Sequence, residues 1–227
     1  MKALVLLSGG IDSTVCLAIA LQKYKKEDIT GIFFNYGQKN IKEIQSARNI
    51  ASYYDIKFIE EDIQNIMKYA KKSSFLLEGS NNNIKDIEYK DGSLREKEYV
   101  PFRNGIMISI LAVYADSLYK DEDTEIYIGI HDSISGRIYA DNTVEFIESM
   151  NKAVNIASYK HISINNPLVK LYKKDVISKG LELKIPFELT WTCYTSNKKP
   201  CGKCGTCKSR LKAFMQNNIT DPLEYEE

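Results

Sequence analysis

A glycine-rich turn near the start of the chain carries the first residues that could do chemistry. Residues 8–14 read Ser-Gly-Gly-Ile-Asp-Ser-Thr, between a short apolar run and a stretch with helical spacing. Glycines in such a turn let backbone N–H groups approach a phosphate, and a following helix N-terminus adds positive potential. Neither G-x-x-x-x-G-K-[ST] nor G-x-G-x-x-G is present, so the two common phosphate motifs are excluded. A simpler interpretation is a tight turn in which Asp12 or Ser13 caps the helix.

Four of the five cysteines form a second group with chemical potential. Cys193, Cys201, Cys204 and Cys207 read C-x7-C-x2-C-x2-C. Four thiolates make a closed tetrahedral Zn²⁺ site, although the spacing is also compatible with an iron–sulfur cluster. The intervening glycines suit a tight knuckle, so we expect a structural zinc site that holds the last helix over the sheet edge. Cys16 stands apart, and we expect it to be a small buried side chain.

The elements that must position these groups alternate between strands and helices. Strands are predicted from apolar runs at 2–7, 29–35, 56–61 and 125–130, with a fifth within 161–168. Helices are predicted over 12–24, 39–54, 62–70, 104–119, 143–157, 173–183 and 207–216, the second with Ile41, Ile44, Ala47, Ile50 and Ala51 on one face. This alternation implies an α/β fold with a mostly parallel five-stranded sheet and helices on both faces. The polar stretch 71–98 is predicted to be a mobile insertion.

Composition and charge limit the classes of partner. The 227 residues are 44% hydrophobic and 27% charged, with a formal net charge of +1, as in an ordinary globular protein. A nearly neutral chain gives no overall attraction for nucleic acid or for an anionic membrane. No apolar run approaches the roughly 20 residues that cross a bilayer, and no signal-peptide pattern is present. We therefore expect a cytoplasmic protein with reduced thiols and no membrane partner.

The turn at residues 8–14 also resembles a known motif. Ser-Gly-Gly-Xaa-Asp-Ser directly after the first strand is similar to the PP-loop of the ATP pyrophosphatases, which cleave ATP between the α- and β-phosphates. The resemblance implies that the pyrophosphate end of ATP is held by Ser8, Gly9, Gly10, Asp12, Ser13 and Thr14. Asp12 is also a candidate Mg²⁺ contact, because a hard cation prefers carboxylate and phosphate oxygens.

Further fragments resemble the QueC family, the 7-cyano-7-deazaguanine synthases, over nearly the whole chain. They are NYGQ at 35–38, YVPFRN at 99–104, NPLVKLYKKDV at 166–176, LTWTCY at 189–194 and CGKCGTC at 201–207. The resemblance implies a homodimeric ligase of queuosine biosynthesis that uses two ATP. The carboxylate of 7-carboxy-7-deazaguanine is adenylated, ammonia converts it to an amide, and a second adenylation gives the nitrile. We expect the ATP-binding domain over 1–190, with the zinc knuckle and last helix over 191–227 packed on it.

The resemblance and the residue types together suggest a role for each group. The catalytic candidates, which would stabilise charge near the α-phosphate together with magnesium, are Lys173, Arg103 and Asp12. The adenosine part of ATP is expected near Asn35, Tyr36 and Gln38. The deazapurine is expected near Tyr139, Asp141, Phe102 and Asn104.

One stretch departs from the family pattern. Where the family commonly has Tyr-Pro-Asp-Cys-Arg, this chain has Ala140, Asn142 and Thr143 at the Pro, Cys and Arg places, and Phe102 replaces a small residue. Thr143 cannot give a carboxylate the bidentate contact that arginine gives. The activated carboxylate could therefore be joined to another amine, such as a protein N-terminus. The sequence also leaves open a tRNA-thiolating PP-loop enzyme with an iron–sulfur cluster, which near-neutral charge disfavours, and a nucleotide-binding module without turnover.

Overall fold

The chain folds around one parallel sheet. The computed structural model describes residues 1–70, 74, 76–78, 99–120, 122–130 and 139–226, so most of the predicted insertion at 71–98 lies outside the described residues. Five strands pair in the order β3-β2-β1-β4-β5, all parallel, which confirms the predicted sheet. They are β1 (Lys2–Leu6), β2 (Ile29–Asn35), β3 (Lys57–Asp62), β4 (Thr124–Tyr127) and β5 (Ile162–Asn165).

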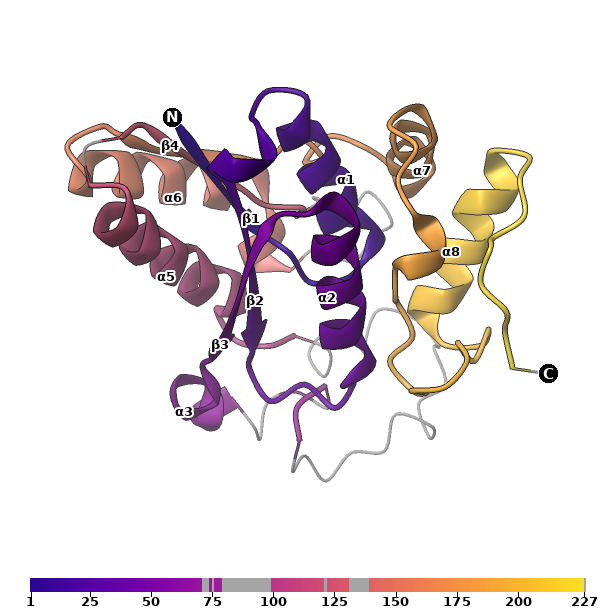
Figure 1. Cartoon of the computed structure of the whole chain (residues 1–227). Coiled ribbons are helices and arrows are strands. Elements are labelled where there is room, and N and C mark those ends of the chain that lie inside the picture. The colour runs from indigo at the N-terminus through magenta and orange to yellow at the C-terminus, as the bar shows by residue number, and fades with distance from the viewer. Residues whose placement is uncertain (71–73, 75, 79–98, 121, 131–138, 227) are drawn as a thin grey trace.

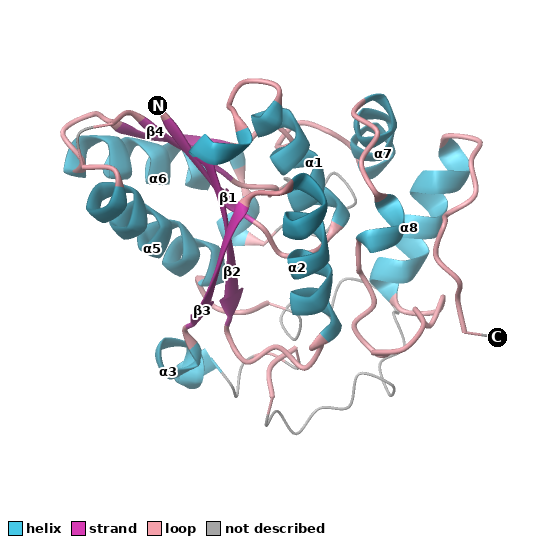
Figure 2. Cartoon of the chain, viewed as in Figure 1, coloured by secondary structure: helices cyan, strands magenta, loops and turns pink. Residues whose placement is uncertain are grey.

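Helices cover both faces of the sheet (Figures 1 and 2). One face carries α1 (Ile11–Leu21) and α2 (Lys42–Tyr54), and the other carries α5 (Arg103–Leu118) and α6 (Val144–Ala157). Farther out, α7 (Lys173–Glu182) and α8 (Gly205–Gln216) pack beyond α1. The helix predicted over 62–70 is shorter, with a single α-helical turn, α3 (Gln64–Met67), that continues as a 3₁₀ turn. Among the helices of the described residues, none is long and apolar enough to cross a membrane.

The residue pattern of β1 explains the two layers. Successive side chains of a strand point to opposite faces of the sheet. Ala3, Val5 and Leu7 accordingly pack with the α1 and α2 side chains, whereas Leu4 packs with those of α5 and α6. All four are fully buried, as expected for a central strand of a parallel sheet covered on both sides.

The start of α2 differs from the prediction. The helix predicted over 39–54 begins at Lys42, because the Asn40 side chain accepts a hydrogen bond from the Lys42 N–H at 2.9 Å. Ile41, expected on the apolar face of this helix, precedes it and is 67% exposed. The Asn40 amide also donates to the Cys193 carbonyl, so residue 40 links the segment before α2 to the cysteine region.

A buried ion pair attaches the C-terminal residues to the rest of the chain. Arg210 of α8 donates to both oxygens of Asp221, at 2.6 and 2.9 Å, and both side chains are 1% exposed. The same guanidinium donates to the Thr190 hydroxyl at 2.7 Å and to the Phe187 carbonyl at 3.1 Å. Arg210 therefore holds residues 187–190, which lead directly into the candidate site.

Removing one partner of this pair should destabilise the whole chain. Asp221→Asn leaves the Arg210 charge buried without its counter-ion, so we expect the free energy of unfolding to fall by about 3 kcal/mol. Denaturant unfolding measures this loss. The matched control is Glu224→Gln, since Glu224 is 82% exposed and its pairing with Lys199 is screened by water. Equal midpoints for the two variants would contradict the anchoring role of Arg210.

Candidate active site and metal centre

The glycine turn presents uncapped backbone N–H groups at the start of α1. Gly10 is the N-cap residue, and no side chain of the described residues caps this helix. The hydroxyls of Ser13 and Thr14 instead donate to the Gly10 carbonyl, at 3.0 and 2.8 Å. The simpler interpretation, in which Asp12 or Ser13 caps α1, is therefore wrong. The helix therefore begins with a glycine N-cap rather than a side-chain cap, and helix starts of this kind bind anions.

Three other segments of the main chain lie directly against the backbone of this turn. Gly9 has φ +81°, and a Cβ on it would lie 2.4 Å from the Glu43 carbonyl oxygen of α2. A Cβ on Gly129, just after β4, would lie 2.9 Å from the Asp12 carbonyl carbon. On a further side, the Trp191 N–H donates to the Gly9 carbonyl at 2.9 Å. The shape of the turn is thus set by contacts with α2, β4 and residue 191.

Two of the predicted catalytic residues form an ion pair beside the turn. The Lys173 ammonium group lies 2.6 and 2.8 Å from the two carboxylate oxygens of Asp12, and both side chains are about three-quarters buried. Lys173 is the first residue of α7, whose start is closed by the Asp175 carboxylate accepting from the Tyr172 N–H at 3.1 Å. Tertiary structure therefore brings together two charges that lie 161 residues apart.

A cavity of about 340 Å³ opens at the carboxyl ends of β1, β2 and β4. This is where the strand order reverses direction, the usual ligand position in open α/β sheets. The predicted site residues that line it are Ser8, Gly10, Asp12, Ser13, Tyr36, Gln38, Arg103, Asn104 and Tyr139. Apart from the four clustered cysteines, the predicted site residues outside its lining are Gly9, Thr14, Asn35, Phe102, Asp141 and Lys173. The cavity thus joins the phosphate turn to the region expected to bind the deazapurine.

Arg103 is held against an aromatic ring inside this cavity. Its guanidinium donates to the Tyr36 hydroxyl at 3.3 Å and lies 5.3 Å from the centre of the Tyr36 ring. Burial opposes the charge of Arg103, but the surrounding tyrosines and Asp141 outweigh it, so the pKa of Arg103 is raised. A permanent positive charge therefore lines the same cavity as the glycine turn.

Asp141 and Thr143 both hold helix starts. Asp141 is 3% exposed, and its carboxylate accepts from the Asn104 N–H at the start of α5, at 3.1 Å. The Asn104 side chain donates back to the Asp141 carbonyl and to the Asn142 side chain, at 3.2 and 2.7 Å. Thr143 caps α6 by accepting from the Phe146 N–H at 3.1 Å. Burial raises the pKa of Asp141, and a direct contact of this carboxylate with a deazapurine stays a prediction.

Phe102 lies at the edge of the site rather than in the cavity lining. It has φ +52° and is 50% exposed, and its ring meets the Phe146 ring edge-on at 5.8 Å. Tyr139, which does line the cavity, stacks on Tyr99 at 5.9 Å, with the rings inclined by 15°. Of these four rings, Tyr139 alone lines the cavity, where its face could pack against a flat heterocycle.

Several lining residues were not predicted from the sequence. They include Glu43 and Met107 on helices, and Trp191 and Tyr194 on either side of Cys193. The last two lie in the fragment LTWTCY, whose resemblance to the family was a signal that could have found them. Glu43 gave no local signal, because a charged residue in an amphipathic helix is normally solvated. Here burial raises the pKa of Glu43 to about 7, although the Arg103 charge opposes the shift.

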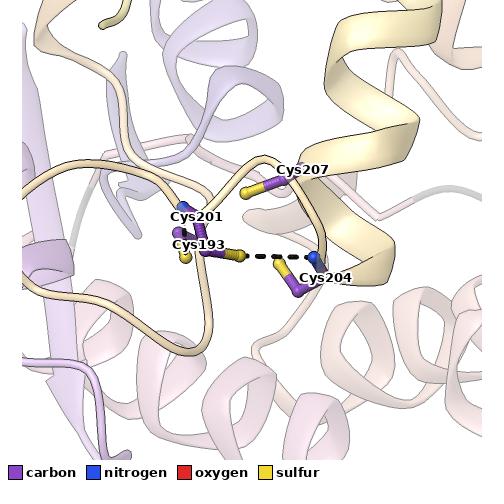
Figure 3. A group of neighbouring side chains, drawn as sticks. All are labelled: Cys193, Cys201, Cys204 and Cys207. Atoms are coloured by element: carbon purple, nitrogen blue, oxygen red, sulfur yellow. Dashed lines mark hydrogen bonds between the residues drawn. The ribbon is translucent and has the colours of Figure 1, made fainter. Parts of the chain in front are cut away.

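The four clustered cysteines converge at the start of α8 (Figure 3). Their sulfur atoms all lie within 4.8 Å of one another, close to the roughly 3.8 Å separation that tetrahedral Zn–S bonds produce. Backbone N–H groups of Cys201 and Cys204 donate to the sulfurs of Cys193 and Cys201, at 3.4 and 3.3 Å. This donor set fits a metal ion. Cys16 is fully buried and donates to the Ile128 carbonyl, as expected for a small core side chain.

Comparisons with known proteins agree with this geometry. The family model described as queuosine biosynthesis protein QueC matches residues 2–218. The 7-cyano-7-deazaguanine synthase of Thermoplasma acidophilum is 39% identical over 235 residues, which cover 100% of this chain and 92% of that protein.

The chain belongs to the QueC family. A second relative of the same name, from Caldicellulosiruptor bescii, is 36% identical over 227 residues, which cover 100% of this chain and 98% of that protein. Among solved structures, an NMN synthetase from Francisella tularensis superimposes with a TM-score of 0.51 at 14% identity, over 96% of this chain and 78% of that one. That likeness concerns the fold alone. The QueC family is an enzyme family of the PP-loop type, in agreement with the motif at residues 8–14.

Loss of one clustered thiol should remove the metal from this QueC family member. We expect Cys204→Ser to lower bound zinc from about one per chain to near zero, because a neutral hydroxyl is a poor substitute for thiolate. Elemental analysis by mass spectrometry of the purified protein measures the content. Cys16→Ala, which removes a thiol outside the cluster, should keep the zinc. Iron in the unchanged protein, or full zinc in Cys204→Ser, would contradict the assignment.

Proposed function

We propose that this chain is an ATP-dependent ligase that converts 7-carboxy-7-deazaguanine and ammonia to 7-cyano-7-deazaguanine, with release of AMP and pyrophosphate. The observation that carries the proposal is the cavity that joins the glycine turn, Arg103 and the Tyr139 ring. An adenylating enzyme needs this arrangement, because the α-phosphate must lie beside the acid that attacks it. The names of the relatives, at 36% and 39% identity over the full chain, support the same substrate.

The proposed reaction activates the same carbon twice. A carboxylate oxygen attacks the α-phosphorus of ATP, and the bond to pyrophosphate breaks. Ammonia then adds to the acyl carbon and AMP leaves, which gives the amide. The amide oxygen attacks a second ATP in the same way. Loss of this second AMP, together with the remaining N–H protons, leaves the carbon–nitrogen triple bond. Both adenylations convert a poor leaving oxygen into a good one.

Each group of cavity residues would bind or stabilise one part of the reacting molecules. The backbone of Ser8 to Ser13 would hold the pyrophosphate end of ATP, in line with its uncapped N–H groups. Tyr36 and Gln38 would contact the adenosine. Asp12 would hold Mg²⁺, which supplies charge neutralisation at the phosphates. Lys173 would keep the Asp12 carboxylate in place and share that neutralisation, while Arg103 would stabilise the charge that develops at the α-phosphate.

The remaining features complete the proposal. Zn²⁺ on the four clustered cysteines would be structural, since a closed Cys₄ site leaves no position for substrate. An ATP-binding domain over 1–190, with the segment 191–227 packed on it, agrees with the apolar core that α1, α7 and α8 share. A cytoplasmic homodimer remains our expectation from the sequence and the family resemblance. The comparisons do not favour an amine-joining or a tRNA-thiolating enzyme.

A product assay tests the proposal directly. Purified protein mixed with ATP, 7-carboxy-7-deazaguanine and ammonium should give a product with the mass of the nitrile, and two AMP per nitrile. Asp12→Ala should abolish pyrophosphate release. If the reaction stops at the amide, the proposal is contradicted. If product forms only with another amine, the proposal is contradicted and an amine-joining enzyme is favoured.

Lys173 and its neighbour give a matched test of the charge at the turn. Lys173→Ala removes the ammonium group paired with Asp12, so we expect carboxylate-dependent pyrophosphate release to fall at least 100-fold. Lys174→Ala changes the adjacent exposed lysine and should stay within about 2-fold of the unchanged protein. Stopped assays of pyrophosphate at saturating ATP measure both. If pyrophosphate release falls to a similar extent in both variants, the loss reflects folding or solubility and the catalytic role of Lys173 is contradicted.

A further inference from the structure

Glu43 is a cavity carboxylate that the proposed roles leave unused. The described side chains that line the cavity include two carboxylates, Asp12 and Glu43. Asp12 is bound by the Lys173 ammonium through both of its oxygens. The Glu43 carboxylate interacts through space with the Arg103 charge and is strongly desolvated. A carboxylate in this cavity needs a functional explanation, because desolvation raises the free energy of its charged form.

Glu43 touches the phosphate turn through its backbone and lines the same cavity as Arg103 and Tyr139. Its carbonyl oxygen packs against Gly9 of the turn, so its backbone is in contact with the phosphate site. Its side chain lines the cavity and interacts electrostatically with Arg103 and Tyr36, which face it from α5 and from the end of β2. In the proposed reaction, the carboxyl group that is adenylated lies in this same cavity.

We propose that Glu43 is the catalytic base that accepts protons from the nitrogen atom as ammonia becomes first the amide and then the nitrile. This inference rests on the proposed function and adds a residue to it. When ammonia adds to the acyl adenylate, an N–H bond breaks, its proton passes to a Glu43 oxygen, and AMP leaves. In the second stage, adenylation of the amide oxygen makes the nitrogen acidic, and one N–H proton passes to Glu43 and on to water, which leaves a C=N double bond. The electron pair of the last N–H bond then forms the triple bond while the C–O bond to AMP breaks. The proton again goes to Glu43 and then to water.

The acidity of Glu43 suits this role. Burial raises its pKa to about 7, so near neutral pH the carboxylate is deprotonated in a large fraction of molecules and can also release the proton again. Among the residues that the structure describes, the other charged or titratable ones lining the cavity are Asp12, Tyr36, Arg103, Tyr139 and Tyr194. Of these, Arg103 carries a permanent positive charge, Asp12 is already paired, and the pKa of Tyr36 is raised by burial. Glu43 is therefore the acceptor best matched to neutral pH.

The test separates the chemistry of nitrogen from that of adenylation. With the carboxylate and ATP but no ammonium, a single turnover of pyrophosphate release should differ by less than about 3-fold between Glu43→Gln and the unchanged protein. With ammonium, or from the amide and ATP, nitrile formation by Glu43→Gln should fall at least 100-fold. Glu43→Asp should recover part of this loss. Glu148→Gln, the same change at an exposed site on α6, should behave as the unchanged protein.

The pH profile gives a second, independent readout. Starting from the amide avoids the titration of ammonia itself. For the unchanged protein, kcat/KM for nitrile formation should rise with pH through an inflection near 7, because only the deprotonated carboxylate accepts a proton. Glu43→Gln should lack this inflection, and thermal unfolding should show that it remains folded.

Each outcome bears on one of the two proposals. Equal loss of pyrophosphate release and nitrile formation in Glu43→Gln would overturn the base role and assign Glu43 to ATP binding. Unchanged nitrile formation, or an inflection that persists in Glu43→Gln, would also overturn it. Absence of carboxylate-dependent pyrophosphate release in the unchanged protein would instead overturn the proposed function, and the role of Glu43 with it.

Discussion

The close packing around Gly9 is the constraint on which the site depends. A left-handed backbone at this residue places the turn directly against the backbone of α2, where no side chain fits. The Gly9 carbonyl then accepts the Trp191 N–H, so a segment from the other end of the chain closes the turn from a third side. These contacts hold the first N–H groups of α1 toward the cavity, since they are made by main chain with little freedom to move.

The cysteine region is coupled to the cavity through the same segment. Trp191 and Tyr194, which flank Cys193, both line the cavity. The Trp191 indole donates to the Cys193 carbonyl at 3.0 Å, and Thr206 of α8 donates to the Thr192 carbonyl at 2.9 Å. The buried Arg210 donates hydrogen bonds to Thr190 and Phe187, which directly precede this segment. A metal centre here would order a wall of the active site as well as the last helix.

The stretch that departs from the family pattern has a structural explanation in this chain. Asp141 and Asn104 hold each other across the start of α5, and Thr143 caps α6. A threonine is a favourable helix cap, so the position where an arginine is common contributes here to helix stability. Because Asn142 still lines the cavity beside Asn104, this region contacts the ligand space through amide groups rather than a guanidinium.

The sequence by itself determined the parallel α/β fold, the phosphate turn and the cysteine cluster. Each depends on local order: apolar runs between helical spacings, glycines directly after a strand, and closely spaced thiols. Only the tertiary structure decided which further residues face the cavity, Glu43 among them, and which predicted ones, such as Phe102, do not. The pairing of Asp12 with Lys173 and the place of Glu43 in the cavity lining depend on how distant elements pack, because a charged residue on a helix looks the same in sequence whether water or a cavity surrounds it. For the same reason, Asp141 could be named from the sequence as a site residue, while its role in holding the start of α5 could not.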